Sequence, residues 1–128
     1  MKIDIRGDGY EIDNAVRSYV DKKIGKLAKK LSKHQLEAAH VIVALKQRDG
    51  DPSHKFQAEI IFRLPPKEEL VAKEAAINMF PAIDIAEAKI ANQLRKYKSK
   101  HDSNKIDRKG TLQRLRRLAD RDYWGSQN

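Results

Sequence analysis

The chemistry that this sequence suggests lies in basic side chains repeated at helical spacing. Lys22, Lys26, Lys29 and Lys33 follow one another at intervals of four, three and four residues. Because a helix turns by about 100° per residue, this spacing predicts one stripe of ammonium groups along a helix. Ammonium groups in a row can contact successive phosphates of a nucleic acid.

A second segment repeats the pattern. Lys89, Lys96 and Lys100 are spaced seven and four residues apart, and Gln93 occupies the missing step. Each stripe lies beside an apolar stripe that fixes its direction, so we expect the two basic stripes to flank one groove. Lysines arranged in this way predict recognition of phosphates and shape, with little reading of bases.

The net charge is concentrated in these two segments. Residues 12–33 carry seven basic and two acidic side chains, and residues 79–101 carry five and two, so the segments hold +5 and +3 of the formal charge of +9. Clustered cations release counterions from a polyanion. If about six to eight phosphates are neutralised, log K against log salt should slope at about −5 to −7. Folded RNA suits this pattern better than duplex DNA, because neither segment has the side-chain pattern that reads base edges.

The elements that position these stripes follow from the hydrophobic pattern. Apolar residues alternate over residues 2–6, 41–45 and 56–62 and more weakly over 70–76, which predicts four strands. Asp13 is the predicted cap of the first helix, with apolar residues from Ile12 to Leu31, and Asn78 that of a second helix reaching Tyr97. The order β-α-β-β-β-α predicts an α+β fold: a two-layer, four-stranded sheet with two helices packed on one face, as in double-stranded-RNA-binding domains.

The composition predicts one folded domain and a tail. Residues 1–101 should form the RNA-binding domain, and residues 102–128 a basic flexible tail with little apolar periodicity. Arginines, Tyr123 and Trp124 in the tail could contact single-stranded RNA, or the tail could be a solvated disordered segment.

Other classes of function find little support in the sequence. There is no Cys, the four His have no metal-ligand spacing, and no Ser lies in a nucleophile elbow. Gly7-Asp8-Gly9 is too short to be a phosphate-cradling loop. We therefore expect no enzyme activity, no cofactor, no metal and no small-molecule substrate. Without a signal-like or membrane-length apolar run, we expect a soluble cytoplasmic protein with no membrane partner.

Several motifs resemble the ribosome hibernation promoting factor family, also called ribosome-associated inhibitor A or sigma-54 modulation proteins. The helix entry at residues 11–17, reading EIDNAVR, is similar to the family's, as is Lys26-Leu27. Leu70-Val71-Ala72 resembles the last strand, and residues 78–84, NMFPAID, resemble the signature Asp-Met-Tyr-x-Ala-Ile-Asp. Lys89, Gln93-Leu94, Lys96 and Lys100 match the basic second helix. The resemblance covers residues 1 to about 101.

The resemblance implies a protein that binds small-subunit rRNA in the decoding region of the ribosome during dormancy. There it would cover the mRNA and tRNA sites and arrest translation. By matching position, the implied RNA contacts are Arg17, Lys26, Lys29, Lys89, Lys96 and Lys100, and the stripe alone adds Lys22 and Lys33.

The sequence also departs from the family pattern. Phe80 replaces the usual Tyr, and Asn92 stands where Arg is frequent. The 27 residues after His101 are fewer than the carboxy-terminal dimerisation domain of long members needs. Two other hypotheses stay open: a general structured-RNA-binding module, and a protein interaction adaptor that uses the exposed sheet face.

Overall fold

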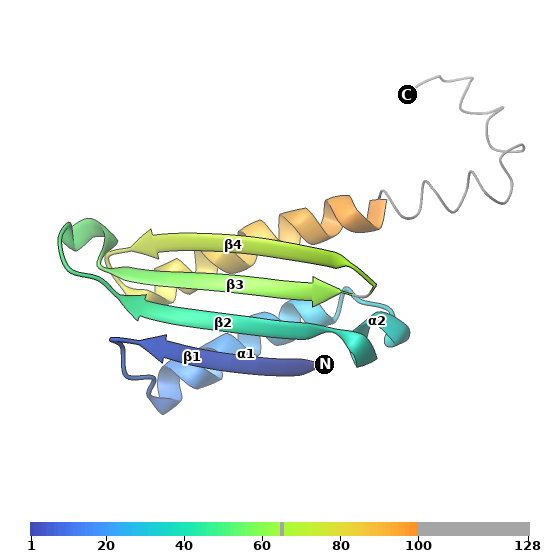
Figure 1. Cartoon of the computed structure of the whole chain (residues 1–128), viewed down its shortest axis with the longest axis horizontal. Coiled ribbons are helices and arrows are strands. Elements are labelled where there is room, and N and C mark those ends of the chain that lie inside the picture. Colours follow the sequence, from blue (N-terminus) through green and yellow to red (C-terminus); the bar gives the residue numbers. More distant parts are fainter. Residues whose placement is uncertain (65, 100–128) are drawn as a thin grey trace, which may run out of the picture. The chain divides into compact units, whose positions relative to one another are not determined.

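Four strands form one sheet, and helices cover one of its faces (Figure 1). This is a computed structural model, and it describes residues 1–64 and 66–99. The sheet order is β1-β2-β3-β4. The strands are β1 (Lys2–Asp8), β2 (His40–Gln47), β3 (Phe56–Leu64) and β4 (Glu68–Ala76). β1 runs parallel to β2, and the other neighbours are antiparallel. The parallel pair requires a crossover, which α1 (Asn14–Ala28) provides.

The inner face of the sheet supplies half of the core. Every second residue of the central strands points inward and is buried, which confirms the predicted period-two pattern. On β2 these residues are Val41, Val43 and Leu45; on β3 they are Ala58, Ile60, Phe62 and Leu64. β4 contributes Leu70 and Ala72. β4 is a strand although Ala is a poor strand former, because its pairing with β3 and the burial of one face outweigh that propensity.

The amphipathic α1 packs on this face. Its buried residues are Val16, Val20, Ile24 and Leu27. Asp13 caps the helix as predicted, since its carboxylate accepts a hydrogen bond of 2.9 Å from the amide of Val16. The prediction that this helix continues to Leu31 and Lys33 is wrong. α1 ends at Ala28, and a separate helix, α2 (Lys33–Ala38), follows.

A capping box explains the break between α1 and α2. The Ser32 hydroxyl accepts from the amide of Gln35, and the Gln35 side chain accepts from the amide of Ser32. These two bonds satisfy amides at the start of a new helix, so Ser32 begins α2 and cannot also be inside α1. The predicted four-lysine stripe is therefore divided between two helices.

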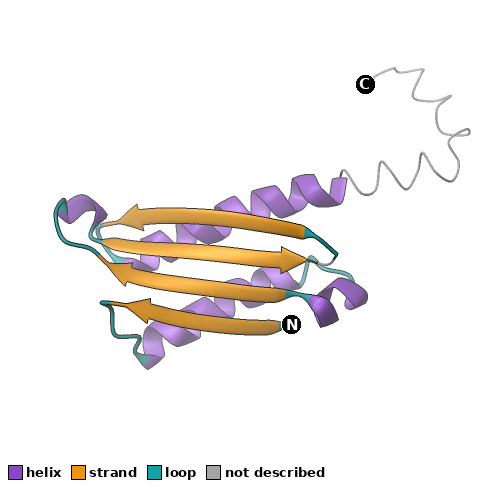
Figure 2. Ribbon diagram, in the orientation of Figure 1, coloured by secondary structure: helices purple, strands orange, loops and turns teal. Residues whose placement is uncertain are grey.

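The last helix comprises residues 79–99 of the described chain, and its residues 79–93 lie beside α1 on the same sheet face (Figure 2). Its buried residues include Met79, Ala82, Ile83, Ala86 and Ile90. The chain divides into two compact units, Met1–Gln93 and Leu94–Asn128, so the end of this helix belongs to the second unit. Leu94 and Tyr97 of the second unit are buried as well. The predicted tail at residues 102–128 lies outside the described residues.

β1 is longer than its glycines suggest. We expected Gly7 to end the strand, but pairing continues to Asp8, which lies opposite Lys46. The backbone carbonyl of Tyr10 lies 2.3 Å from where a Cβ of Gly7 would be, so Gly7 permits a close approach of the chain and does not break the strand. Gly9, with φ of 65°, makes the turn. The predicted α+β architecture of four strands with helices on one face is thus confirmed.

Candidate nucleic-acid interface

The basic side chains of α1 lie on the helical side of the sheet, and they point in different directions. Arg17, Lys22, Lys26 and Lys29 are all exposed. Lys22 and Lys29 are about 160° and 180° around the helix from the buried Val20, so both project straight into solvent. Neither forms an ion pair within residues 1–64 and 66–99. Lys22 of α1 and Lys29, the C-cap residue directly after α1, are therefore both available to a phosphate.

Tyr19 and Lys23 define the side of α1 that faces helix 79–99. The Tyr19 hydroxyl donates a hydrogen bond of 2.5 Å to Asp84 Oδ1. Lys23 Nζ lies 3.1 Å from the same oxygen. The rings of Tyr19 and Phe80 pack edge to face with their centroids 5.0 Å apart. Asp84 therefore connects the two helices through one carboxylate.

The protonation of this cluster is shifted by its own hydrogen bonds. The hydrogen bond from Tyr19, with a further contribution from Lys23, holds the pKa of Asp84 below its usual value although burial opposes this. The same bond raises the pKa of Tyr19, because losing the proton would put two negative charges together. The hydrogen bond to Asp84 also raises the pKa of Lys23. At neutral pH the cluster therefore holds a carboxylate, an ammonium and a neutral phenol.

Acidic groups reduce the positive potential between the helices. The charge of Lys26 contributes to the lowering of the Asp84 pKa. Glu87, which is 7% exposed, contributes to the raising of the Lys23 pKa. Phosphates approaching between α1 and helix 79–99 would therefore meet carboxylates as well as lysines.

Lys89 lies on the far flank of its helix. It is five residues beyond Asp84, which is about 140° around the helix. It forms an ion pair with Glu74 of β4, and the nearby Gln93 donates a hydrogen bond of 2.9 Å to the carbonyl of Val71 in β4. Since Asp84 faces α1 and Lys89 faces β4, the prediction that the two basic stripes flank one groove is wrong for Lys89.

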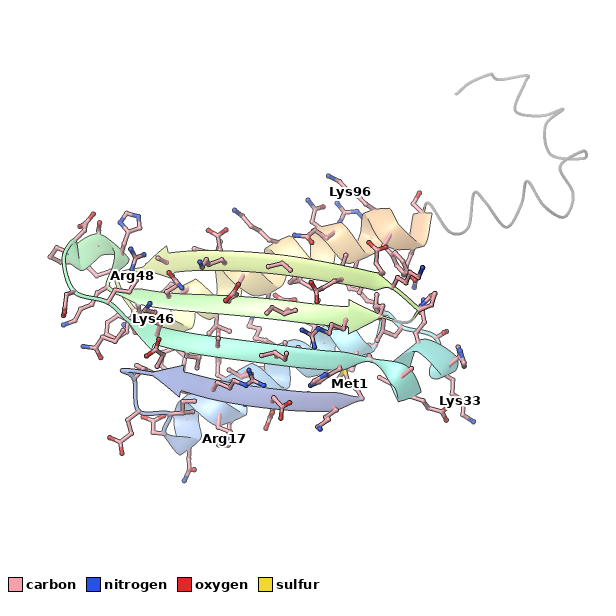
Figure 3. All side chains as sticks on the ribbon, in the orientation of Figure 1. Met1, Arg17, Lys33, Lys46, Arg48 and Lys96 are labelled. Atoms are coloured by element: carbon pink, nitrogen blue, oxygen red, sulfur yellow. The ribbon has the colours of Figure 1, made fainter. Side chains whose placement is uncertain are left out.

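Arg17 and Lys33 lie at the margins of the helical layer. Arg17 is two residues before Tyr19, about 160° around α1 from it, and is labelled at the lower edge of the molecule in Figure 3. Lys33 is exposed on α2 at one end of the sheet (Figure 3). The cations of the first unit thus form a broad surface, which we call the basic helical surface: Arg17, Lys22, Lys26, Lys29, Lys33 and Lys89.

The two remaining predicted contacts fall elsewhere. Lys96 is exposed and belongs to the second unit, which is described by itself. Lys100 lies outside the described residues. Both remain predictions from the sequence.

Sequence reasoning missed the part played by Tyr19, Lys23 and Asp84. In the sequence, Asp84 is the last residue of the NMFPAID motif, and no motif includes Lys23. The spacing Tyr19-Lys23 on one helix and Phe80-Asp84 on the other is i, i+4 in both, which places each pair on one helix face. That signal could have suggested contact faces, but it does not say that these two faces meet.

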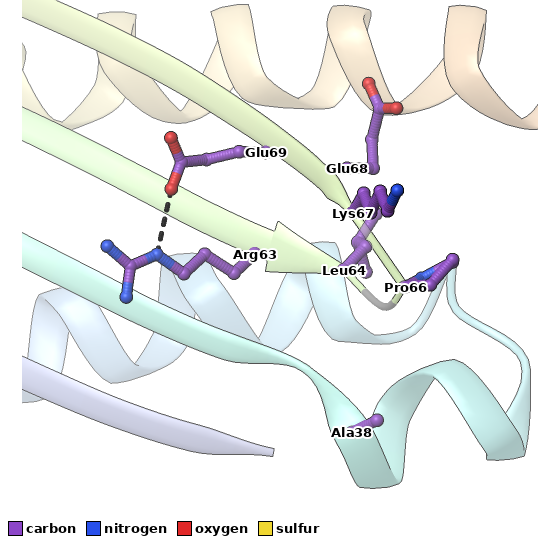
Figure 4. Close-up of a pocket in the computed structure, with 7 residues that line it drawn as sticks. All are labelled: Ala38, Arg63, Leu64, Pro66, Lys67, Glu68 and Glu69. Carbon is purple, nitrogen blue, oxygen red and sulfur yellow. Dashed lines mark hydrogen bonds and ion pairs between the residues drawn. The ribbon is translucent and has the colours of Figure 1, made fainter.

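A shallow hollow of about 320 Å³ lies at one end of the sheet, near the β3–β4 turn (Figure 4). Its lining includes Arg63, Lys67, Glu68 and Glu69, with Arg63 Nε 2.8 Å from Glu69 Oε2. These two positive and two negative charges offset each other, so the hollow gives no preference for an anion. Within residues 1–64 and 66–99, no three His, Asp or Glu side chains gather in a way that could hold a metal ion. No helix in that part of the chain is long and apolar enough to cross a membrane.

Comparison with curated proteins gives relatives with one shared name. The chain is 33% identical over 101 residues to the ribosome hibernation promotion factor of Lactococcus lactis subsp. cremoris. It is 29% identical over 109 residues to the protein of the same name from Staphylococcus aureus. These matches cover 78% and 84% of this chain but 51% and 54% of the relatives. The chain therefore spans about half the length of the curated relatives that it matches.

Solved structures share the fold. The N-terminal domain of Thermus thermophilus Protein Y matches with a TM-score of 0.64 and 26% identity, over 76% of this chain and 99% of that domain. A ribosomal subunit interface protein from Coxiella burnetii matches with a TM-score of 0.60 and 20% identity, over 77% of this chain and 99% of the other. At that identity the second match shows the fold alone.

A family model also matches most of the chain. It is described as Sigma 54 modulation protein / S30EA ribosomal protein, and it covers residues 3–102, which include the described helices and strands except Lys2, the first residue of β1. The motifs from which the resemblance was inferred lie within this range. The chain belongs to the Sigma 54 modulation protein / S30EA ribosomal protein family.

Proposed function

We propose that this protein is a ribosome-associated hibernation factor that inhibits translation by binding small-subunit rRNA at the decoding region. Bound there, it excludes mRNA and tRNA during dormancy. The names of its relatives support the hibernation role, since both are called ribosome hibernation promotion factors. Membership of the family supports the ribosome as partner.

The observation that carries the rRNA part of the proposal is the exposure of Lys22 and Lys29. They project from the solvent side of α1, with Arg17 and Lys33 at the margins of the same layer. Such lysines bind phosphates as point charges and do not need to read bases. A broad surface of separate cations suits folded rRNA, whose phosphates lie on several strands at once.

The mechanism is steric and needs no chemical step. The two-layer domain is held rigid by its core, so ion pairs at the basic helical surface fix the whole body on the RNA. mRNA and tRNA are then excluded by overlap with that body. Within this surface Lys89 contributes less than Lys22 and Lys29, because Glu74 competes with phosphate for it.

Cosedimentation with purified small subunits, at low and high salt, tests the proposal. We expect wild-type protein to pellet with the small subunits at low salt and to be released at high salt. A plot of log K against log salt concentration should have a slope of about −5 to −7. The double variant Lys22→Glu, Lys29→Glu should lose at least about tenfold in affinity. Lys73→Glu, on the opposite face of the sheet, is the control for charge and should bind as wild type does.

The decoding-region part has its own measurement. Protein added before tRNA should prevent tRNA from binding to programmed small subunits, and tRNA bound first should slow the protein's association. Binding to subunits without any competition with tRNA or mRNA would exclude the decoding region. Equal binding to unrelated folded RNAs would favour the general RNA-binding module, and no binding to RNA would favour the adaptor.

A further inference from the structure

The two edge strands of the sheet, β1 and β4, differ in their hydrogen bonds to the rest of the described chain. At β4 the Gln93 side chain of helix 79–99 satisfies the carbonyl of Val71. At β1 no backbone hydrogen bond reaches the outer edge from any part of the described chain. An open strand edge of seven regular residues, without Pro or a bulge, is a template for another strand.

The free hydrogen-bonding groups of β1 belong to alternate residues. The Lys2 amide donates to the carbonyl of Ala39 at 3.0 Å, so Lys2 points its backbone groups toward β2. The parallel register then directs the backbone groups of Asp4, Arg6 and Asp8 to β2 as well. The amides and carbonyls of Ile3, Ile5 and Gly7 therefore face the open edge.

The side chains of β1 carry a self-complementary charge pattern. The strand reads Lys2-Ile3-Asp4-Ile5-Arg6-Gly7-Asp8, with charges +, −, + and − at every second residue. In an antiparallel pair of two such strands centred on Ile5, Lys2 lies opposite Asp8 and Asp4 lies opposite Arg6. Opposite charges at directly facing positions stabilise a strand pair, whereas like charges destabilise it.

From this pattern we infer that β1 is a homodimerisation edge that binds β1 of a second copy of this chain, antiparallel and centred on Ile5. Ile5 exchanges backbone hydrogen bonds with Ile5 of the second copy, and Ile3 does so with Gly7 of the second copy. The charged residues then occupy the non-hydrogen-bonded positions, where side chains approach most closely. The result is one continuous sheet of eight strands, four from each copy.

The charge pattern also selects a single register. A slip of two residues one way puts Asp4 opposite Asp4 of the second copy, and a slip the other way puts Arg6 opposite Arg6. A slip of one residue would exchange the two faces of the sheet. The centred register alone pairs every charge, and it also covers Ile3 and Ile5, which are only partly buried at the edge.

The charged groups are available for this pairing. Arg6 is exposed and has no ion pair within the part of the chain that the structure describes. Asp4 uses Oδ2 to contact His40 Nε2 at 2.9 Å, which leaves Oδ1 for an arginine. Asp8 is 3.9 Å from Lys46, a loose pair on the surface that can accept a second cation. Forming the dimer therefore breaks no interaction within the domain.

Charge-swap complementation tests the dimer without RNA, so its outcome is independent of the proposed function. Positions 4 and 6 face each other in the centred register. Arg6→Asp makes both positions acidic, and Asp4→Arg makes both basic. In sedimentation equilibrium of the full chain, wild type should approach twice the monomer mass as concentration rises toward about 1 mM. Each variant alone should associate at least about tenfold more weakly, because like charges then face each other twice.

Mixing the two variants gives the decisive result. In the mixed pair each acidic residue at positions 4 and 6 lies opposite an arginine, so we expect a heterodimer as stable as the wild-type dimer. Lys73→Asp and Glu68→Arg make the same charge changes on β4 and should dimerise as wild type does. Circular dichroism confirms that every variant is folded. The inference would be overturned if wild type stays monomeric or if the charge changes leave dimerisation unaltered. It would also be overturned if the mixed variants do not associate.

Discussion

Asp84 of helix 79–99 accepts a hydrogen bond of 2.5 Å from Tyr19 of α1, and so joins the two helices that carry the basic surface. The same Oδ1 contacts Lys23 at 3.1 Å. Although Asp84 subtracts charge from an interface proposed to bind RNA, it fixes how α1 and the start of helix 79–99 are placed against each other.

We expect Asp84→Ala to lower the free energy of unfolding by about 1–2 kcal/mol, because a hydrogen bond to a charged group and an ion pair are lost together. Urea denaturation monitored by circular dichroism measures this change. Asp21→Ala removes an exposed carboxylate from α1 and should change stability by less than about 0.5 kcal/mol. Equal effects of the two substitutions would show that Asp84 does not connect the helices.

The dependence of stability on pH should report the same group. The pKa of Asp84 is held below its ordinary value of 3.8 by Tyr19 and Lys23. A carboxyl whose pKa is lower in the folded state adds stability that is present above pH 3.8 and is lost as the pH falls through the folded pKa. Wild type should therefore lose more stability than Asp84→Asn between about pH 5 and pH 2. Parallel curves over that range would contradict this assignment.

Ser32→Ala should loosen α2 without unfolding the domain. The substitution removes the hydroxyl that accepts from the Gln35 amide, a cap typically worth about 1 kcal/mol. Amide hydrogen exchange within Lys33–Ala38 should then accelerate about fivefold, because lowering the free energy of helix opening by about 1 kcal/mol raises the opening equilibrium constant by about that factor. Ser18→Ala, an exposed site on α1, is the matched control. Unchanged exchange in α2 would mean that the capping box does not hold the helix.

Glu74→Gln should strengthen binding to ribosomes if the proposed function is right. Glu74 pairs with Lys89, so removing its charge releases that ammonium for phosphate. We expect about a two- to fivefold rise in affinity at low salt, which fades as salt screens the contact. Glu68→Gln makes the same charge change on β4 at a residue with no ion pair in the described chain, and a comparable rise there would point to net charge alone.

The hydrophobic pattern was sufficient for most of the fold. Alternation over residues 56–62 and the helical spacing of Val16, Val20 and Ile24 indicated strand and helix correctly, because burial of one face dominates the stability of each element. The ends of the helices and strands were harder to predict, because they depend on local hydrogen bonds and contacts. The capping box at Ser32 and Gln35 ends the first helix early, and Gly7 lies inside a strand because a nearby carbonyl needs the space.

The element order and the buried stripes could be predicted from periodicity along the chain, and the excess of positive charge on the helical segments from their composition. Which flank of each helix faces which neighbour could not be predicted in this way. Spacing along a helix gives angles relative to that helix alone, whereas the contacts of Asp84 with Tyr19 and of Lys89 with Glu74 depend on how separate elements pack. That packing directs Lys89 toward β4, leaves Lys22 and Lys29 in solvent and exposes the charged edge of β1.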